Sequence, residues 1–377
     1  MFQLIHRCKW LYVICFVLSW IPAGCSDQTQ NVEAVDFGAV KLAAEQGDAK
    51  AQNSLGEIFA NGKGVEQNDT EAVEWFRKSA EQGNAAAQHN LGLMYARGRG
   101  VTQDDAEAVK LYMQAAEQGY ASAQYDLGFM YAEGRGVEQS YAEAEKWYRK
   151  AIEQGNAAAQ NNLGVMYANG RGVERDDAEA VKFYTLAAGQ GVAIAQFNLG
   201  AMYQNGRGVE RDDAEAVKWY RKSAEQGFSY AQNDLGVMYD GGQGVAQNDA
   251  EAVKWYRKAA EQGLAISQKN LGVMYATGRG VDLNYAESAK WFRMAAEQGD
   301  EDAYSALEKV SRLEQDQREG ISHDGSCRPR TNVIRCSSQC YNGDCVVTYE
   351  NGCRVRVQVR PRYDSFREGW TYPSPDC

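Results

Sequence analysis

A repeat of 36 residues constrains this chain more than any other feature of its sequence. A Leu-Gly pair and an aromatic pair recur in one register with a third element, Gly-x-Gly-Val. The third element begins at Gly62, Gly98, Gly134, Gly170, Gly206, Gly242 and Gly278, always 36 residues apart. Elements that stay in phase over seven copies define a repeat array, in which each unit packs mainly against its neighbours.

Each unit predicts two helices joined by a glycine turn. In the unit that begins at Asn156, this residue can cap a first helix whose apolar residues recur at helical spacing. Residues 170–172 (Gly-Arg-Gly) close that helix, because glycine accepts the left-handed conformation. Asp176 or Asp177 can cap the second helix. Each helix pair exposes an apolar flank that only the next pair can cover, so the repeat predicts an all-α solenoid.

Composition agrees with this prediction. The chain has 38 glycines and 5 prolines, and every proline lies outside residues 26–328. Helices that end at glycines rather than at prolines account for both facts. Part of a second helix at residues 43–47 and a further first helix at 303–313 flank the seven copies, so we expect end caps there.

Units of this length, with the motifs A-x-A-Q-x-x-L-G-x-M-Y-x-x-G-x-G-V and W-Y-x-x-A-A-E-Q-G, resemble Sel1-like repeats, a branch of the tetratricopeptide superfamily. The resemblance covers residues 34–313. The turn arginine is replaced at Lys63 and Gln243, the aromatic at Leu111 and a glutamate at Gly189. The resemblance implies a right-handed α-solenoid of about seven repeats that binds proteins, with the first helix of each unit lining its concave side.

The positions of the first helix that its own core leaves free vary from unit to unit. We expect them to face outward and to bind a protein partner. The predicted partner-binding residues are His89, Leu93, Tyr125, Phe129, Asn161, Val165, Phe197, Asn233, Val237 and Lys269. Several are apolar, and an exposed apolar strip marks a partner site. The alternative is that these side chains pack against adjacent helices of the superhelix.

Two further rows of residues repeat with the units. The first consists of Asn90, Asp126, Asn162, Asn198, Asp234 and Asn270. We expect it to be structural, with each side chain bonding to the next unit's turn, and the alternative is a grip on a peptide backbone. The second consists of the turn residues Arg99, Arg135, Arg171, Arg207 and Arg279. Their units are rich in Asp and Glu, so we expect solvated or salt-bridged arginines rather than an anion site.

Charge restricts the class of partner. The formal net charge of the chain is −11, and residues 26–319 alone carry −15. Nucleic-acid phosphates need a surface of Lys and Arg, so this balance argues against nucleic acid. It favours a basic protein partner, because complementary charge speeds the encounter.

Residues 1–24 predict an export signal. A basic start precedes an apolar run of twelve residues, which is too short to span a bilayer. Ala-Gly before Cys25 resembles a bacterial lipobox, which implies that Cys25 is lipidated and that the protein is held in the periplasm or at the outer membrane. Pro22 stands where such boxes carry Leu, so ordinary cleavage with secretion, or a retained anchor, stays open. Residues 25–33 are predicted as a linker.

The C-terminal end has a different composition. Residues 314–324 are predicted as a linker, and residues 325–377 form a small module with no helical period. Its predicted disulfide-forming residues are Cys327, Cys336, Cys340, Cys345, Cys353 and Cys377. Export and an even cysteine count favour disulfides, in a pairing that stays open, over the alternative of a zinc site. Residues 345–359 predict a β-hairpin whose arginine face could bind an anionic glycan such as peptidoglycan.

The sequence lacks the motifs of an enzyme. It has no Ser-x-x-Lys, Ser-Asp-Asn, Lys-Thr-Gly or Gly-x-Ser-x-Gly. Beyond the signal its histidines are His89 and His323, far apart in sequence, and we expect His89 to lie on the surface. No catalytic, metal or cofactor site is therefore predicted. The favoured function is a protein-binding scaffold or adaptor in the bacterial envelope. The alternatives are a secreted or surface factor that contacts a host protein, and a glycan binder that acts through the C-terminal module.

Overall fold

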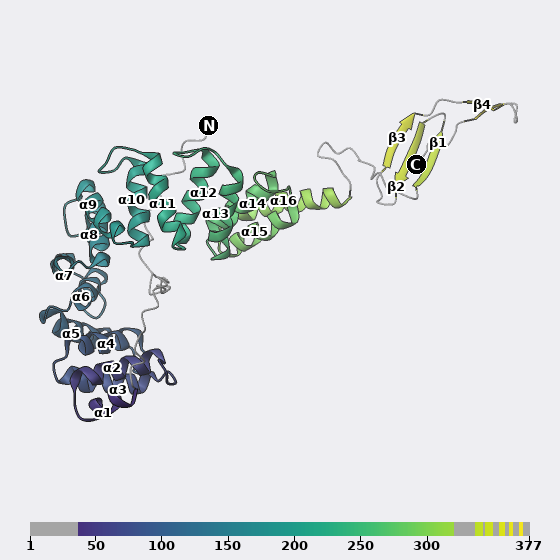
Figure 1. The fold of residues 1–377 in the computed structure, drawn as a ribbon. Coiled ribbons are helices and arrows are strands. Elements are labelled where there is room, and N and C mark those ends of the chain that lie inside the picture. The colour runs from purple at the N-terminus through teal and green to yellow at the C-terminus, as the bar shows by residue number, and fades with distance from the viewer. Residues whose placement is uncertain are drawn as a thin grey trace.

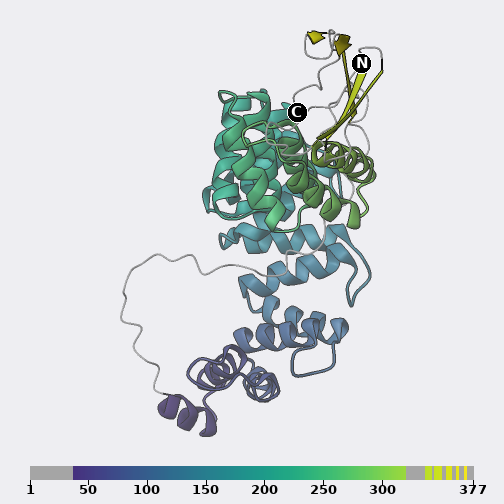
Figure 2. The ribbon, with the colours of Figure 1, turned by 90° about the vertical axis from the view of Figure 1, so that its right-hand side faces the viewer.

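The computed structural model describes residues 37–319 and five strand segments nearer the C-terminus. Figures 1 and 2 show the helices following one another in pairs along a curved array. The helices are α1 (Phe37–Glu45), α2 (Ala49–Asn61), α3 (Asp69–Glu81), α4 (Ala85–Arg97), α5 (Asp105–Glu117), α6 (Ala121–Glu133), α7 (Tyr141–Glu153), α8 (Ala157–Asn169), α9 (Asp177–Gly189), α10 (Ala193–Asn205), α11 (Asp213–Glu225), α12 (Ser229–Gly241), α13 (Asp249–Glu261), α14 (Ala265–Thr277), α15 (Tyr285–Glu297) and α16 (Glu301–Glu319). The predicted all-α solenoid is confirmed over this part of the chain.

The capping residues and the glycine turn delimit the helices as predicted. Asn156 precedes α8, and its side chain accepts a hydrogen bond from the third amide of that helix. Gly170 ends α8 in the left-handed conformation, with φ of 65°. Asp176 caps α9, because its carboxylate accepts hydrogen bonds from two amides of the first turn. Asp177, the other candidate cap, is the first residue inside the helix.

The Leu-Gly motif packs the two helices of a unit together. Leu163, on α8, is fully buried in a core cluster that also holds Phe183 of α9 and Tyr148 of the preceding α7. A Cβ atom on Gly164 would lie 2.8 Å from the ring of Tyr184, so only glycine permits the helices to approach this closely. The same contact recurs at Gly92 with Tyr112, Gly128 with Tyr148, Gly200 with Tyr220, Gly236 with Tyr256 and Gly272 with Phe292.

The Gly-x-Gly turn also joins neighbouring units. A Cβ atom on Gly208 would lie 2.1 Å from the carbonyl oxygen of Asp177, which belongs to the preceding unit. Arg207 donates a hydrogen bond to the carboxylate of the same residue at 2.6 Å. Equivalent ion pairs join Arg99 to Asp69, Arg135 to Asp105 and Arg279 to Asp249. The salt-bridged role predicted for the turn arginines is confirmed at these four positions. The preceding unit offers Arg171 no aspartate, because Tyr141 occupies that position.

The two ends of the array carry single helices, α1 and α16. α16 runs to Glu319, so the linker predicted at 314–324 begins within a helix. Nearer the C-terminus, β1 (Cys336–Tyr341), β2 (Asp344–Tyr349) and β3 (Arg354–Gln358) pair as an antiparallel sheet, and β4 (Arg362–Asp364) pairs with β5 (Gly369–Thr371).

Several predictions from the sequence concern residues outside the described part. They are the signal at 1–24, lipidation at Cys25, the linker at 25–33 and the disulfides of the C-terminal module, whose side chains are not described. These stay predictions. Within the described residues, the helices are all too short or too polar to cross a membrane.

Candidate protein-binding face

The first helix of each unit lies on the inner side of the curve in the N-terminal half of the array. In Figure 1, α4 and α6 face the hollow of the arc, whereas α5 and α7 lie outside them. The ten predicted partner-binding residues all lie on the even-numbered helices α4–α14. We call the surface of these helices that carries the ten residues, together with their exposed neighbours, the inner face.

The predicted residues are less exposed than expected. His89, Asn161 and Asn233 are buried, with exposed fractions of 7%, 4% and 4%, so the expectation that they face outward is wrong. The other residues are half-buried: Leu93, Tyr125, Phe129, Val165, Phe197, Val237 and Lys269. Leu93 and Phe129, for example, pack against the core around α5 and α6. The alternative of packing between helices therefore applies to the three buried residues and, in part, to the others.

The three buried residues take part in hydrogen bonds between neighbouring first helices. His89 Nε2 lies 2.7 Å from Asp126 Oδ2. Asn198 Nδ2 donates to Asn161 Oδ1 at 3.0 Å, Asn270 Nδ2 to Asn233 Oδ1 at 3.1 Å, and Asn90 Nδ2 to Asn53 Oδ1 at 3.0 Å. We call this series the polar ladder. Asn90, Asp126, Asn198 and Asn270 of the Asn/Asp row are structural, as predicted, but their partners lie on the preceding unit's first helix and not in the next unit's turn.

Aromatic residues interrupt the polar ladder at two positions. Tyr125 and Phe197 occupy the places that Asn or His fills in the units beside them. Opposite Tyr125, Asn162 donates instead to the hydroxyl of Tyr148 at 3.3 Å. Opposite Phe197, the carboxylate of Asp234 accepts a hydrogen bond from its neighbour Asn233 at 2.9 Å. Burial raises the pKa of Asp234 to about 6, and the ion pairs of the described residues do not include it.

One turn before Asp234 on α12, Tyr230 belongs to a group of aromatic rings on the inner face. The ring centroid of Phe197 lies 5.3 Å from that of Phe228 and 6.4 Å from that of Tyr230. Tyr230 is 39% exposed, and on the next first helix Ile266 and Val273 are 46% and 41% exposed. The inner face is therefore apolar and open to solvent along α12 and α14.

Tyr230 and Ile266 are not among the residues predicted from the sequence. Both occupy the position two residues before the Gln of the Ala-Gln motif, where other units carry Ala86, Ser122, Ala158 and Ile194. This position varies as freely as those that were selected. Variation there was the signal that could have identified these residues.

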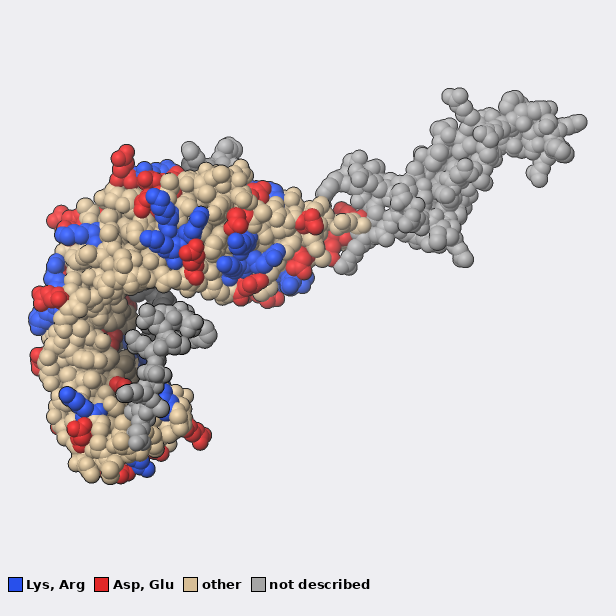
Figure 3. Space-filling view, in the orientation of Figure 1, with Lys and Arg blue, Asp and Glu red and all other residues tan. Residues whose placement is uncertain are grey.

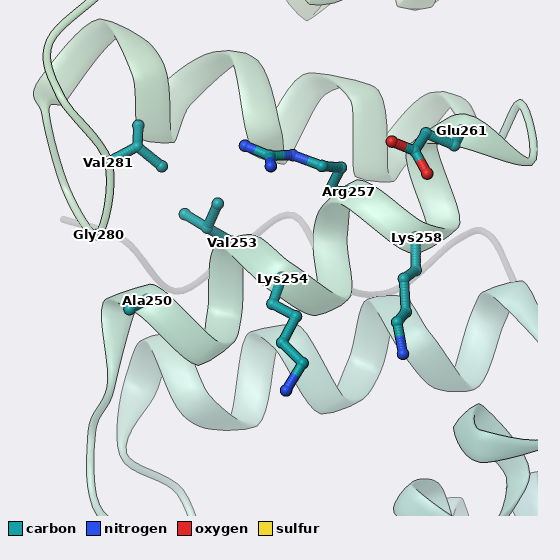
Figure 4. A pocket seen from close by; sticks show the side chains of 8 residues that line it. All are labelled: Ala250, Val253, Lys254, Arg257, Lys258, Glu261, Gly280 and Val281. Carbon is teal, nitrogen blue, oxygen red and sulfur yellow. The ribbon is translucent and has the colours of Figure 1, made fainter.

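The outer helices α11 and α13 present a different surface, on which Lys and Arg side chains gather (Figure 3). Beside α13, Val253 and Val281 line a shallow groove of about 450 Å³. Arg257 points toward these valines, whereas Lys254 and Lys258 point away from them (Figure 4). The basic groups have partners within the chain: Glu251 for Lys254, the Tyr275 hydroxyl for Arg257 and the Trp255 ring for Lys258. This groove is therefore a weaker candidate than the inner face.

Comparisons with known proteins agree with the repeat architecture. The Sel1 repeat model matches residues 49–84, 85–120, 121–156, 157–192, 193–228, 229–264 and 265–300. A Sel1 repeat protein from Oxalobacter formigenes is 33% identical, with a TM-score of 0.58 over 65% of this chain and 96% of that one. A protective antigen present in uropathogenic Escherichia coli strains, which displays an SLR fold, is 39% identical, with a TM-score of 0.55 over 73% of this chain and 67% of that one. The curated proteins contain no match.

Repeats of this type generally serve as protein-interaction modules and are typically non-enzymatic scaffolds. Seven consecutive matches cover well over half of the chain. The resemblance inferred from the motifs is therefore confirmed, and the chain belongs to the Sel1 repeat family.

Proposed function

We propose that this protein is a non-enzymatic scaffold of the bacterial cell envelope, a right-handed solenoid that binds a protein partner through the inner face. One observation carries the proposal. Within a fixed packing motif, the inner face exposes the apolar side chains Tyr230, Ile266 and Val273, which the neighbouring units leave uncovered. Apolar side chains gathered on an exposed face are typical of a partner site.

The sequence supports the location in the envelope. Removal of the export signal predicted at residues 1–24 would take Cys8 and Cys15 with it, and lipidation would then account for Cys25, the one cysteine left besides the six of the C-terminal module. Mass spectrometry of the mature protein from its native cells tests this part of the proposal. We expect an N-terminus at a lipidated Cys25, and an unmodified N-terminus at another residue contradicts it.

Site-specific crosslinking tests the binding face. A photoreactive phenylalanine at position 273 places the probe on the inner face, and one at position 186 places it on α9, where Leu186 is 48% exposed. We expect a covalent adduct with a discrete protein from position 273 and none from position 186. Equal adducts from both positions, or an adduct from position 186 alone, contradict the proposal.

A second candidate function is contact with a host protein. It is favoured by the similarity to the E. coli protective antigen, which is 39% identical over most of the array. The two functions differ in the source of the crosslinked partner. An adduct that forms only when host cells are present, and not in the bacterial envelope, favours the host-directed function.

A further inference from the structure

Asp234 departs from the pattern of the polar ladder. At the same position, four of the other six units carry Asn and the first unit carries Ser54, whereas Asp126 has His89 beside it. Asp234 is a half-buried carboxylate opposite Phe197, a side chain that cannot donate a hydrogen bond. A carboxylate in such a place costs free energy unless a cation accompanies it. Since Asn serves in the equivalent units, the fold does not require this charge.

The aromatic group next to Asp234 is not required by the fold either. In the unit that precedes the one with Phe197, Asn161 occupies the position equivalent to Phe197. Ala158 of the same unit occupies the position equivalent to Tyr230. The rings nonetheless gather, because the centroids of Phe228 and Tyr230 lie 5.7 Å apart and both lie near Phe197. A charge and a group of rings that the array can omit therefore occur together on one stretch of the inner face.

On the neighbouring first helices α10 and α14 and in the turns that follow them, the described Lys and paired Arg side chains already have carboxylate partners. Lys269, on α14, lies 3.1 Å from both Asp300 and Asp302. Arg279, in the following turn, pairs with Asp240 and Asp249. Within the part of the chain that the structure describes, no Lys or Arg therefore balances the charge of Asp234, which leaves this carboxylate available to a cation of another molecule.

This inference rests on the proposed function. We propose that Asp234 with Phe197, Phe228 and Tyr230 forms a subsite for one lysine or arginine side chain of the partner protein, and that the partner carries an apolar residue beside that side chain. The aliphatic stem would pack against the rings and the charged group would reach the carboxylate. The apolar neighbour would lie on Ile266 and Val273, which are exposed on the adjoining helix. A charge-assisted hydrogen bond shielded by aromatic rings is stronger than one in open water.

Two peptides test this proposal. The probe is the labelled peptide Ala-Leu-Lys-Leu-Ala, and its counterpart has norleucine for lysine, which keeps the stem and removes the charge. We expect the full-length protein to bind the lysine peptide about tenfold more tightly than the norleucine peptide by fluorescence anisotropy. Equal affinities, or no binding of either peptide at millimolar concentration, overturn the proposal.

Substitutions that copy residues from the chain's other repeats test whether the lysine side chain of the peptide binds at Asp234 and Tyr230. Asp234→Asn installs the residue that four other units use, and it should weaken the lysine peptide about tenfold while the norleucine peptide is unaffected. Tyr230→Ala installs the residue of the unit at Ala158, and it should weaken both peptides. Asp282→Asn, which removes an exposed carboxylate between α14 and α15, is the matched control and should change neither affinity.

The outcomes separate this proposal from the proposed function. If Asp234→Asn leaves the lysine peptide unaffected while position 273 still crosslinks a partner, the subsite is wrong and the scaffold function stands. If the charge-dependent peptide binding is found but position 273 crosslinks nothing, the scaffold function fails and the subsite stands.

Discussion

At the scale of single residues, two aspartates of the array titrate in opposite directions. Hydrogen bonds from Arg207 and then Arg175 lower the pKa of Asp177 to about 2. Burial raises the pKa of Asp234 to about 6 from an ordinary value of 3.8. One carboxylate thus stabilises the stack in its charged form, whereas the other is held in a place that disfavours its charge.

This difference predicts the effect of Asp234→Asn on stability. A folded pKa above the unfolded one means that the native state holds the proton more tightly, so stability falls as pH rises from about 4 to about 6. Tyr220 and Tyr256, which interact electrostatically with Asp234, have raised pKa values and stay neutral in this range. Asp234→Asn should therefore raise the free energy of unfolding by about 1–2 kcal/mol at pH 7.5 and by much less at pH 4. Urea unfolding at both pH values measures this, and an equal gain at both contradicts it.

Substitution by alanine should change the free energy of unfolding in opposite directions at two glycines, Gly208 and Gly189. Gly208→Ala should cost about 3 kcal/mol or more, because φ is 67° and the new Cβ would collide with the Asp177 carbonyl of the preceding unit. Gly189→Ala should gain about 0.5–1 kcal/mol, because Gly189 ends α9 with no atom within 4 Å of the position of a Cβ. Thermal unfolding of the two variants side by side measures both effects. A similar loss in both would show that the collision at Gly208 is relieved elsewhere.

At the scale of elements, the first helices differ in how they begin. α8 has a side-chain cap from Asn156, whereas α10 begins after Val192 without one. The backbone at the two positions is almost the same, with φ and ψ of −63° and 108° at Asn156 and of −67° and 111° at Val192. The geometry for a cap is therefore present at α10 although the capping side chain is missing.

This comparison predicts that Val192→Asn stabilises the array. The new side chain should accept a hydrogen bond from the first turn of α10 and raise the free energy of unfolding by about 1 kcal/mol, less what the lost Val packing contributes. Asn156→Ala is the matched variant and should lower it by about 1 kcal/mol. Urea unfolding tests both variants. A loss in Val192→Asn as large as that in Asn156→Ala would mean that packing of the valine outweighs the cap.

At the scale of the whole molecule, the array is a stack in which each helix pair rests on its neighbours. Deletion of one complete unit, residues 157–192, should leave a folded and shorter array, because the same kind of apolar packing between helix pairs can form again across the junction. We expect an undiminished helical signal per residue in circular dichroism and a smaller denaturant m-value. Loss of cooperative unfolding would contradict this view of the array.

The sequence by itself determined the period, the helix pairs and the turns, because caps, left-handed glycines and apolar spacing act within a few residues of one another. It also predicted the salt-bridged arginines, since acidic residues recur in every unit. Exposure on the inner face was decided only by the tertiary structure. His89, Asn161 and Asn233 look free within one unit and are buried once the next unit packs against them. Residues 37 positions apart form the polar ladder because the stacking of units brings successive first helices side by side, which no pattern within a single unit specifies.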